Sequence, residues 1–227
     1  MDLFKIKYGL QQQIERHLND KDIKGKYILD VGCGYGWLEE VFIKRGAKKV
    51  VGIEISEDFI NKAKDRKIKN VLFKKASALN IPYRKETFDV AVSFEVLEHI
   101  PSNSEIKMFE EVFRVLKPGG IFYLSTPNKA LLPVLLDPAW WLIRHRHYST
   151  KQIKNYLTLT GFSYNSIYVR GGIYTMLLLI AMYLTKWIIK KEPIIYPYLL
   201  KKSREEYKLN KGCLSIFVRC EKPKINK

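Results

Sequence analysis

Two stretches of the chain carry residues that could do chemistry, and the first is a run of glycines at alternate positions, Gly32-Cys33-Gly34-Tyr35-Gly36. It follows the β-rich run YILDV, which contains Asp30, and it precedes an amphipathic segment. Glycine lets the backbone turn tightly and approach a ligand closely, because no side chain stands in the way. Glu54 ends the next β-rich run, at the offset expected for a carboxylate that binds ribose hydroxyls. The combination predicts a ribose-containing cofactor at this turn.

Two other interpretations of the glycine run are weaker. A tight strand-to-helix turn without a ligand would leave Glu54 as a surface carboxylate at a strand end. A nicotinamide dinucleotide would use a related turn, but the spacing here is G-x-G-x-G rather than G-x-G-x-x-G. A chain of 227 residues also leaves little room for a separate catalytic domain.

The second stretch is Glu95-Val96-Leu97-Glu98-His99, which follows the fourth β-rich run. If this stretch winds as a helix, the i, i+3 and i+4 spacing brings Glu95, Glu98 and His99 onto one face. Such a face is half of a metal site, or it holds a general base, because imidazole titrates near neutral pH. In the structural alternative Glu95 touches a cofactor, Glu98 caps or pairs at the surface, and His99 only packs.

Short β-rich runs alternate with amphipathic segments, which is typical of a parallel sheet covered by helices. Strands are predicted at 26–31, 49–54, 70–74, 88–94 and 120–125, and helices at 36–46, 57–67 and 103–117. A loop-rich insertion after residue 125 leads to a helix at 150–160 and to strands at 162–170 and 212–220. We therefore expect one α/β domain over residues 1–227, Rossmann-like and doubly wound, with a mostly parallel seven-stranded sheet and an apolar helical insertion before the last strand.

The net charge is +17, from 40 basic and 23 acidic side chains. Such a charge favours an anionic partner, a lipid surface or a nucleic acid, although a solvated surface explains it as well. Cys33, Cys213 and Cys220 form neither a metal-ligand pair nor an even disulfide set, and the amphipathic N-terminus lacks the features of a secretory signal. These observations predict a cytoplasmic protein.

Four segments resemble, in order, the successive motifs of class I S-adenosylmethionine-dependent methyltransferases of type 11/12: ILDVGCGYG, VVGIEIS, SALNIPYRKETFDVAVSFEVLEHI and VLKPGGIFYLSTPN. The resemblance covers about residues 25–170 and implies S-adenosylmethionine as the cofactor. It places the methionine part of the cofactor at the glycine turn, its ribose at Glu54 and its adenine at Ser77. Glu95 would lie beside the cofactor. Many members carry Asp where this chain has Ser77, whose hydroxyl can still accept the adenine hydrogen bond. The predicted cofactor site is Asp30, Gly32, Cys33, Gly34, Gly36, Glu54, Ile55, Ser77, Ala78 and Glu95.

The Glu95–His99 stretch also resembles the ExxEH element of ubiquinone-pathway O-methyltransferases and of small-RNA terminal methyltransferases, in which a further histidine completes a divalent-metal site. By that resemblance a Mg²⁺ or Zn²⁺ ion would be held by Glu95, Glu98, His99 and His147, with His145 as the alternative to His147. Without a metal, His99 or His147 would be the general base. Methyl transfer otherwise depends on alignment, because the sulfonium already carries an activated methyl group.

The insertion at 171–211 separates a cofactor-binding core at 25–170 from the last strand at 212–221, and residues 1–24 form an N-terminal helical segment. Residues 173–189 are apolar except for Tyr, Thr and Lys186, but as a helix they would be about 25 Å long, just under the hydrocarbon core. The strands on both sides are expected to be neighbours in one sheet, so the chain must return to the side it left. We therefore expect a monotopic helix on the inner face of the membrane, or alternatively a buried helix or an oligomer interface.

In the membrane interpretation the stretch 173–202 contacts an anionic lipid surface, with aromatic rings at headgroup depth and lysines facing the lipids. These residues are Tyr183, Trp187, Tyr196, Lys186, Lys190, Lys191, Lys201 and Lys202. Trp140-Trp141 would lie near the entrance for an apolar acceptor. The expected function is O-methylation of a lipid-like or quinone-like small molecule; the alternatives are an RNA-modifying methyltransferase and a non-catalytic cofactor-binding scaffold.

Overall fold

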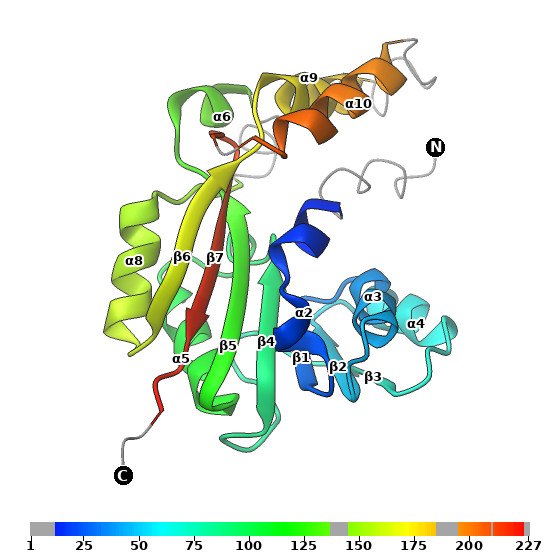
Figure 1. The fold of residues 1–227 in the computed structure, drawn as a ribbon, viewed down its shortest axis with the longest axis vertical. Coiled ribbons are helices and arrows are strands. Elements are labelled where there is room, and N and C mark those ends of the chain that lie inside the picture. The colour runs from blue at the N-terminus through cyan, green and yellow to red at the C-terminus, as the bar shows by residue number, and fades with distance from the viewer. Residues whose placement is uncertain (1–11, 137–144, 185–194, 210, 225–227) are drawn as a thin grey trace.

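A seven-stranded sheet forms the centre of the computed structural model, which describes residues 12–136, 145–184, 195–209 and 211–224. The strands are β1 (Tyr27–Val31), β2 (Lys49–Glu54), β3 (Val71–Lys75), β4 (Phe88–Phe94), β5 (Leu116–Pro127), β6 (Ser163–Arg170) and β7 (Ser215–Glu221). Their order in the sheet is β3-β2-β1-β4-β5-β7-β6 (Figure 1). Strands β1 to β5 are parallel, and β7 runs antiparallel between β5 and β6. The predicted mostly parallel α/β fold is confirmed.

Helices cover both faces of the sheet because strand side chains alternate between two apolar clusters. Leu29 and Val51 belong to the cluster that includes side chains of α5 (Glu105–Val115) and α8 (Thr150–Leu159). Their neighbours Ile28 and Val50 belong to the cluster that includes α3 (Trp37–Lys44) and helical residues 12–17. Strands that are buried on both faces read as near-continuous apolar runs, as the sequences of β1 and β4 do.

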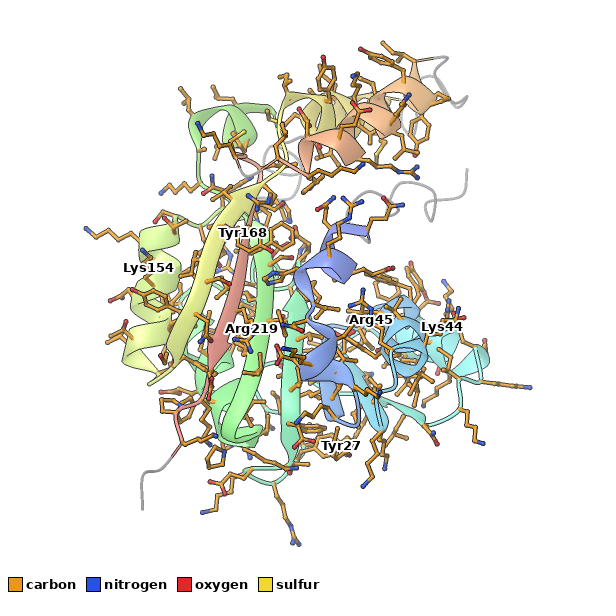
Figure 2. All side chains as sticks on the ribbon, viewed as in Figure 1. Tyr27, Lys44, Arg45, Lys154, Tyr168 and Arg219 are labelled. Carbon is orange, nitrogen blue, oxygen red and sulfur yellow. The ribbon has the colours of Figure 1, made fainter. Side chains whose placement is uncertain are left out.

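Some of the helices begin where a polar side chain accepts a hydrogen bond from a free amide of the first turn. The Ser56 hydroxyl accepts a hydrogen bond from the Phe59 amide at 3.4 Å, at the start of α4 (Glu57–Asp65). Ser149 and Gln152 form a capping box at the start of α8. The short helix α2 (Asp20–Ile23) is held to β7 by the ion pair of Asp22 with Arg219 at 2.8 Å (Figure 2).

Several boundaries differ from the prediction. Strand β5 begins at Leu116 rather than 120, and α5 ends at Val115, because Leu116 already pairs with Phe88 of β4. Strand β7 begins at Ser215, after the predicted 212. The stretch predicted as loop-rich contains a helix, α6 (Leu131–Leu136), whose Pro133 stands in its first turn, where a missing amide hydrogen is tolerated.

Three helices, α6, α9 (Ile173–Leu184) and α10 (Tyr196–Glu206), lie together beyond the carboxyl edge of the parallel strands (Figure 1). Helices α9 and α10 pack through a cluster of their own, formed by Leu178, Tyr196 and Leu199. Of the predicted helix at 173–189, residues 173–184 are helical; Trp140, Trp141, Lys186, Trp187, Lys190 and Lys191 lie outside the described residues. No helix within the described part of the chain has the length and apolarity needed to cross a membrane.

Tyr196 contradicts its predicted place at headgroup depth. Its side chain is only 7% exposed, because it stands in the first turn of α10 and faces α9, beside Leu178 and Leu199. Lys201 is exposed, as predicted, whereas Lys202 pairs with Glu205 at 2.9 Å. Among the described residues of the insertion, Tyr196 and Lys202 are therefore less available to lipid headgroups than the sequence predicts.

Candidate functional site

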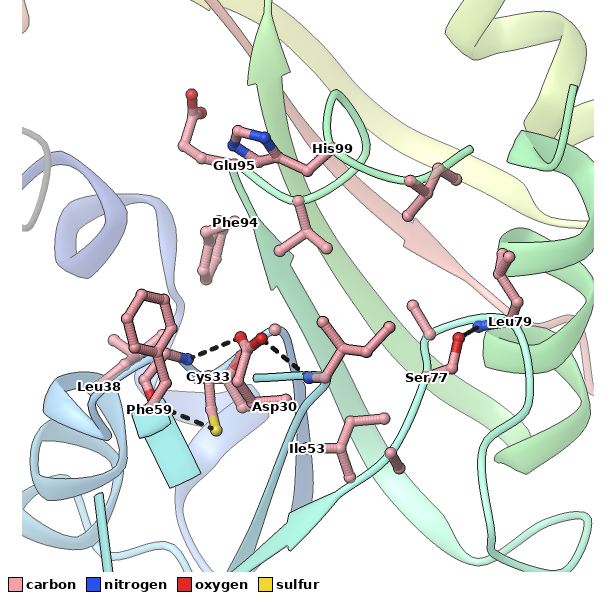
Figure 3. A pocket seen from close by; sticks show the side chains of 18 of the residues that line it. Asp30, Cys33, Leu38, Ile53, Phe59, Ser77, Leu79, Phe94, Glu95 and His99 are labelled. Carbon is pink, nitrogen blue, oxygen red and sulfur yellow. Dashed lines mark hydrogen bonds between the residues drawn. The ribbon is translucent and has the colours of Figure 1, made fainter. Parts of the chain in front are cut away.

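A cavity of about 550 Å³ lies where β1, β2 and β4 end (Figure 3). In open α/β sheets ligands bind outside the carboxyl ends of the strands, at the point where the strand order reverses. That point here lies between β1 and β4, and the volume lies in the range of small-molecule sites. All of the predicted cofactor residues except Gly36 line this cavity, and the other lining residues are Ile14, Trp37, Leu38, Ile53, Phe59, Ala76, Leu79, Phe94, Val96, His99, Ile100 and Pro101.

The three glycines of the turn have three different surroundings. All have positive φ: +80° at Gly32, +52° at Gly34 and +74° at Gly36. A Cβ at Gly32 would meet Val96 at 2.3 Å, and one at Gly36 would meet the Phe73 ring at 2.6 Å, whereas one at Gly34 would meet nothing within 4 Å. Gly36 therefore allows the turn to pack on β3, while Gly34 leaves the cavity open.

Glu54 is held in place by backbone amides before any ligand arrives. Its Oε2 accepts a hydrogen bond from the Gly34 amide at 3.3 Å, and its Oε1 accepts from Ile55 at 2.8 Å and from Ser56 at 3.0 Å. A carboxylate has about four acceptor positions, so both oxygens keep capacity for ribose hydroxyls. These bonds link the glycine turn to the end of β2 and fix the carboxylate at the cavity wall.

Two buried carboxyl groups lie beneath the glycine turn. Asp30 is 4% exposed, and burial followed by the charge of Glu54 raises its pKa to about 8. Glu39 of α3 is fully buried, and burial followed by the charge of Asp30 raises its pKa well above the usual range. The sequence analysis missed Glu39, although its position three residues before the core residue Phe42 was a signal that it faces inward. A cationic ligand group would stabilise the ionised form of Asp30.

Ser77 and Glu95 are both engaged within the protein. The Ser77 hydroxyl accepts a hydrogen bond from the Leu79 amide at 3.1 Å, which closes a turn at the cavity wall (Figure 3). Glu95 has φ +56°, a strained conformation for a residue other than glycine, and its carboxylate accepts from the Ser125 hydroxyl at 2.6 Å. Strain of this kind concentrates at functional sites, and here it turns the chain directly after β4.

His99 reaches the same cavity from the turn that follows β4. Its ring lies 4.9 Å from that of His145, and burial lowers its pKa, against the opposing charge of Glu98. His99 is therefore neutral at physiological pH, and a neutral imidazole can accept a proton.

Glu98 and two histidines form a cluster next to the cavity. One ligand atom from each of Glu98, His99 and His145 lies within 4.8 Å of the others. Glu98 Oε2 accepts a hydrogen bond from the Thr126 hydroxyl at 3.1 Å, and Glu98 Oε1 lies 3.7 Å from His145 Nε2. The prediction that Glu98 caps or pairs at the surface is wrong, because its side chain is fully buried.

The structure corrects the predicted metal set at two positions. His147 does not join the cluster: its ring centroid is 5.9 Å from that of His145, and it does not line the cavity. Glu95 is also outside the cluster, because its carboxylate turns to Ser125. His145, which was the alternative to His147, lies in the cluster instead.

Arg146, which the sequence analysis did not single out, holds the turn that carries Glu98 and His99. Its guanidinium donates to the backbone oxygens of Leu97, at 2.9 Å, and of Glu98 and Ile100, and it pairs with Glu105. The Tyr148 hydroxyl reaches Leu97 and Glu105 at 3.0 Å each. No periodic signal marks Arg146, because its partners are backbone oxygens almost fifty residues earlier. It brings His145 against Glu98.

Comparison with known proteins agrees with this site. The family described as methyltransferase domain matches residues 5–167, well over half of the chain. The strand order and the cofactor turn fit that match. The chain belongs to this family of S-adenosylmethionine-dependent methyltransferases.

Among individual proteins, the chain is 34% identical over 135 residues to a ubiquinone biosynthesis O-methyltransferase of Coxiella burnetii, a match covering 55% of this chain and 50% of the relative. The chain thus spans about half the length of the curated relatives it matches. A crystal structure of an S-adenosylmethionine-dependent methyltransferase from Mesorhizobium loti is similar with a TM-score of 0.65 and 19% identity, over 94% of this chain and 97% of that one. The [4+2]-cyclase SpnF is similar with a TM-score of 0.70 and 20% identity, over 95% and 80%. These two structural similarities show only that the fold is shared.

Proposed function

We propose that this methyltransferase transfers the methyl group of S-adenosylmethionine to an oxygen of a small, lipid-like or quinone-like acceptor at a membrane surface. The observation that carries the proposal is the mixed lining of the cavity. Carboxylates and backbone groups line it at the glycine turn and at the end of β2, and apolar side chains such as Ile14, Trp37 and Phe94 line it as well. The polar groups suit the cofactor, and the apolar side chains suit an apolar acceptor. The likeness to ubiquinone biosynthesis O-methyltransferases supports the same acceptor class.

In the proposed reaction His99 is the general base. It lines the cavity from the turn directly after Glu95, and as a neutral imidazole it can take the proton that the acceptor hydroxyl loses. The acceptor oxygen would bond to the methyl carbon while the bond from that carbon to the sulfonium sulfur breaks, and S-adenosylhomocysteine would leave as a neutral thioether. Glu54 and the glycine turn would hold the cofactor, and Asp30 would compensate the charge of its ammonium group. Arg146 would keep His99 in place through the turn that it clamps.

The cluster next to the cavity offers a second way to activate the acceptor hydroxyl. Among the described residues, Glu98 Oε1 is a buried oxygen without a hydrogen-bond partner, and it faces His145. A carboxylate and two imidazoles fit Zn²⁺ better than Mg²⁺, which prefers oxygen ligands. When bound, such an ion lowers the pKa of a coordinated hydroxyl. Glu98, His99 and His145 would then be its ligands, and His99 would not serve as the base.

Chelation separates these two roles of His99. If His99 is the base, EDTA leaves activity unchanged and Glu98→Gln lowers it only modestly. If the cluster holds an ion, EDTA abolishes activity, added Zn²⁺ restores it, and Glu98→Gln loses both activity and bound metal. Glu110→Gln removes the same charge from an exposed position of α5 and serves as the control.

An apolar patch beyond the carboxyl edge of the parallel strands supports the membrane part of the proposal. Leu131 and Leu135 of α6 are 75% and 50% exposed, and Ile173 and Leu177 of the contacting helix α9 are 46% and 42% exposed. Contiguous exposed apolar side chains mark membrane or partner contacts, and with the exposed Lys201 on α10 they suit an anionic lipid surface. We infer a peripheral attachment to the inner face of the membrane.

The test of the proposal is transfer of label from methyl-labelled S-adenosylmethionine into a total lipid extract and, separately, into total RNA. Label in the lipid fraction, absent with His99→Ala, supports it. Label in RNA alone would replace it with the RNA-modifying alternative, which the +17 charge favours. Calorimetric binding of the cofactor with no label in either fraction favours a non-catalytic scaffold.

A further inference from the structure

Glu39 is a buried carboxyl group that the proposed reaction does not use. Its side chain, on α3, is fully buried, and neither of its oxygens has a hydrogen-bond partner in the described part of the chain. Gly52 makes room for it, because a Cβ at Gly52 would meet Glu39 Oε1 at 2.4 Å and the Cys33 sulfur at 2.8 Å. The carboxyl of Glu39 therefore occupies the place that a side chain at Gly52 would fill.

The register of the sheet places this carboxyl beside Asp30. Gly52 is the partner of Asp30 in the parallel pairing of β1 with β2. Residues that pair in register point to the same face of a sheet, and neighbouring strands lie about 4.8 Å apart. Glu39 Oε1 therefore lies next to the Asp30 side chain, on the face of the sheet that α3 covers. Glu54, two residues after Gly52, points to the same face.

The surroundings of these three carboxyl groups contain little positive charge. No Lys or Arg is among the described residues that line the cofactor cavity. The positive charge that acts on Glu39 is that of Arg66, which follows α4 and already pairs with Glu40 at 2.7 Å. Glu54 accepts hydrogen bonds from three backbone amides, as an ionised carboxylate does. Two more buried negative charges would lack partners, so Asp30 and Glu39 hold protons in the ligand-free protein.

The pKa directions agree with this distribution of protons. Burial, followed by the charge of Glu54, raises the pKa of Asp30 to about 8, and burial followed by the charge of Asp30 raises the pKa of Glu39 well above its usual range. Burial also raises the pKa of the Cys33 thiol, and β4 places the apolar Val92 beside Asp30. Asp30 and Cys33 both line the cavity (Figure 3), and of these two Asp30 can ionise near neutral pH.

We propose that the cofactor displaces a proton from Asp30 when it binds, and that Glu39 stays protonated behind Asp30 as a positioning residue. S-adenosylmethionine carries an ammonium group at its amino-acid end, and an ammonium beside Asp30 favours the carboxylate. The proton passes from the Asp30 carboxyl to water, and the carboxylate pairs with the ammonium. Glu39 keeps Asp30 away from water without adding a second charge. The inference rests on the contact between Asp30 and the ammonium in the proposed function, and it is independent of the methyl acceptor.

Calorimetric titration of the full-length protein with S-adenosylmethionine, in buffers of different ionisation enthalpy, counts the protons released. The wild type is expected to release about one proton per cofactor near pH 6.5 and to bind about tenfold more tightly per pH unit between about pH 6 and 7.5. This range lies below the pKa of an α-amino group, about 7.7–8.0, so the cofactor keeps its ammonium. Binding without proton release, and with an affinity independent of pH, overturns the inference.

Variants of the two carboxyl groups assign the proton. Asp30→Asn is expected to release none and to bind with an affinity independent of pH. Glu39→Gln, which imitates the neutral carboxyl, is expected to release as many protons as the wild type, whereas Glu39→Ala admits water beside Asp30 and should release fewer. Glu110→Gln, at an exposed position of α5, is the control and should match the wild type, and thermal midpoints report whether each variant is folded. Release that survives Asp30→Asn overturns the assignment to Asp30, and release lost in Glu39→Gln, or unchanged in a folded Glu39→Ala, overturns the role of Glu39.

Two analogues locate the charge that displaces the proton. S-adenosylhomocysteine keeps the ammonium and lacks the sulfonium charge, so it should release the same proton. Methylthioadenosine lacks the amino-acid part and should release none. Release by methylthioadenosine, or none by S-adenosylhomocysteine, overturns the inference. Because these titrations contain no acceptor, proton release without label in any lipid contradicts the proposed acceptor alone, and label in lipid without proton release contradicts this inference alone.

Discussion

Two alanine substitutions in the glycine turn should separate stability from cofactor binding. Gly36→Ala places a methyl group 2.6 Å from the Phe73 ring and 3.2 Å from Ala63, at a φ of +74°. The left-handed backbone costs about 1–2 kcal/mol and the overpacking about 1–3 kcal/mol, so the free energy of unfolding should fall by about 2–5 kcal/mol. For a chain of this length that corresponds to a drop in Tm of roughly 4–20 °C.

Gly34→Ala should affect cofactor binding more than stability. Its φ of +52° also carries the left-handed cost, about 1–2 kcal/mol, but the new methyl group meets no atom within 4 Å and stands at the wall of the cofactor cavity. The Tm should therefore fall by only about 2–8 °C. Binding of S-adenosylmethionine should weaken by about fivefold or more, since a bound ligand would meet the methyl group at a cost of about 1–3 kcal/mol.

The assay is differential scanning calorimetry of both variants without ligand, followed by titration with S-adenosylmethionine below the lower midpoint. Gly36→Ala should keep most of its affinity once folded, because Gly36 does not line the cavity. The reasoning fails if Gly34→Ala loses as much stability as Gly36→Ala, or if Gly36→Ala loses affinity with an unchanged Tm.

Three further predictions follow from the buried charges and the apolar patch. Burial raises the pKa of Asp30 above its ordinary value, so the stability that this group contributes is complete below about pH 4 and is lost as the pH rises through the folded value of about 8. The Tm of the ligand-free protein should therefore fall from pH 5 to 8, and it should fall less in Asp30→Asn. Equal slopes of Tm against pH in the two proteins would contradict this. Arg146→Met should lower the free energy of unfolding by about 3–5 kcal/mol, since it leaves the buried Glu105 without its ion-pair partner, and chemical denaturation showing a loss below about 1 kcal/mol would refute the clamp. The double variant Leu131→Ser/Leu135→Ser should float less with anionic liposomes than the wild type. Leu159→Ser, which changes a residue 61% exposed on α8, should float like the wild type. Equal flotation of the wild type and both variants would show that the patch does not contact the membrane.

Much of the fold could be predicted because residues that are close together in the sequence determine the strands and the helix starts. The runs YILDV and FDVAVSF are apolar enough to be buried on both faces, and Ser56 and Ser149 mark helix starts by a hydroxyl that caps nearby amides. The start of β5 was harder to predict, because Leu116 joins the sheet by pairing with Phe88, a residue in a separate segment of the chain.

The same difference between local and long-range contacts explains which site residues could be predicted. The glycine turn and Glu54 are close in sequence to the strands that place them, and their spacing alone indicated a cofactor. The choice of His145 over His147 depends on Arg146, which docks on a turn almost fifty residues earlier. Glu39 was missed because nothing in the sequence shows that it faces Asp30.

The acceptor is the part of the function that the fold does not determine. The [4+2]-cyclase SpnF has a similar fold, with a TM-score of 0.70, so this fold is compatible with different chemistry. What distinguishes this chain is what lines the shared cavity, namely His99 with its neighbouring cluster and apolar side chains such as Phe94. The proposed acceptor, with a hydroxyl and an apolar body, would meet both. Because the two requirements rest on different residues, variants at His99 are expected to lower kcat, whereas variants at Phe94 are expected to raise the KM for the acceptor.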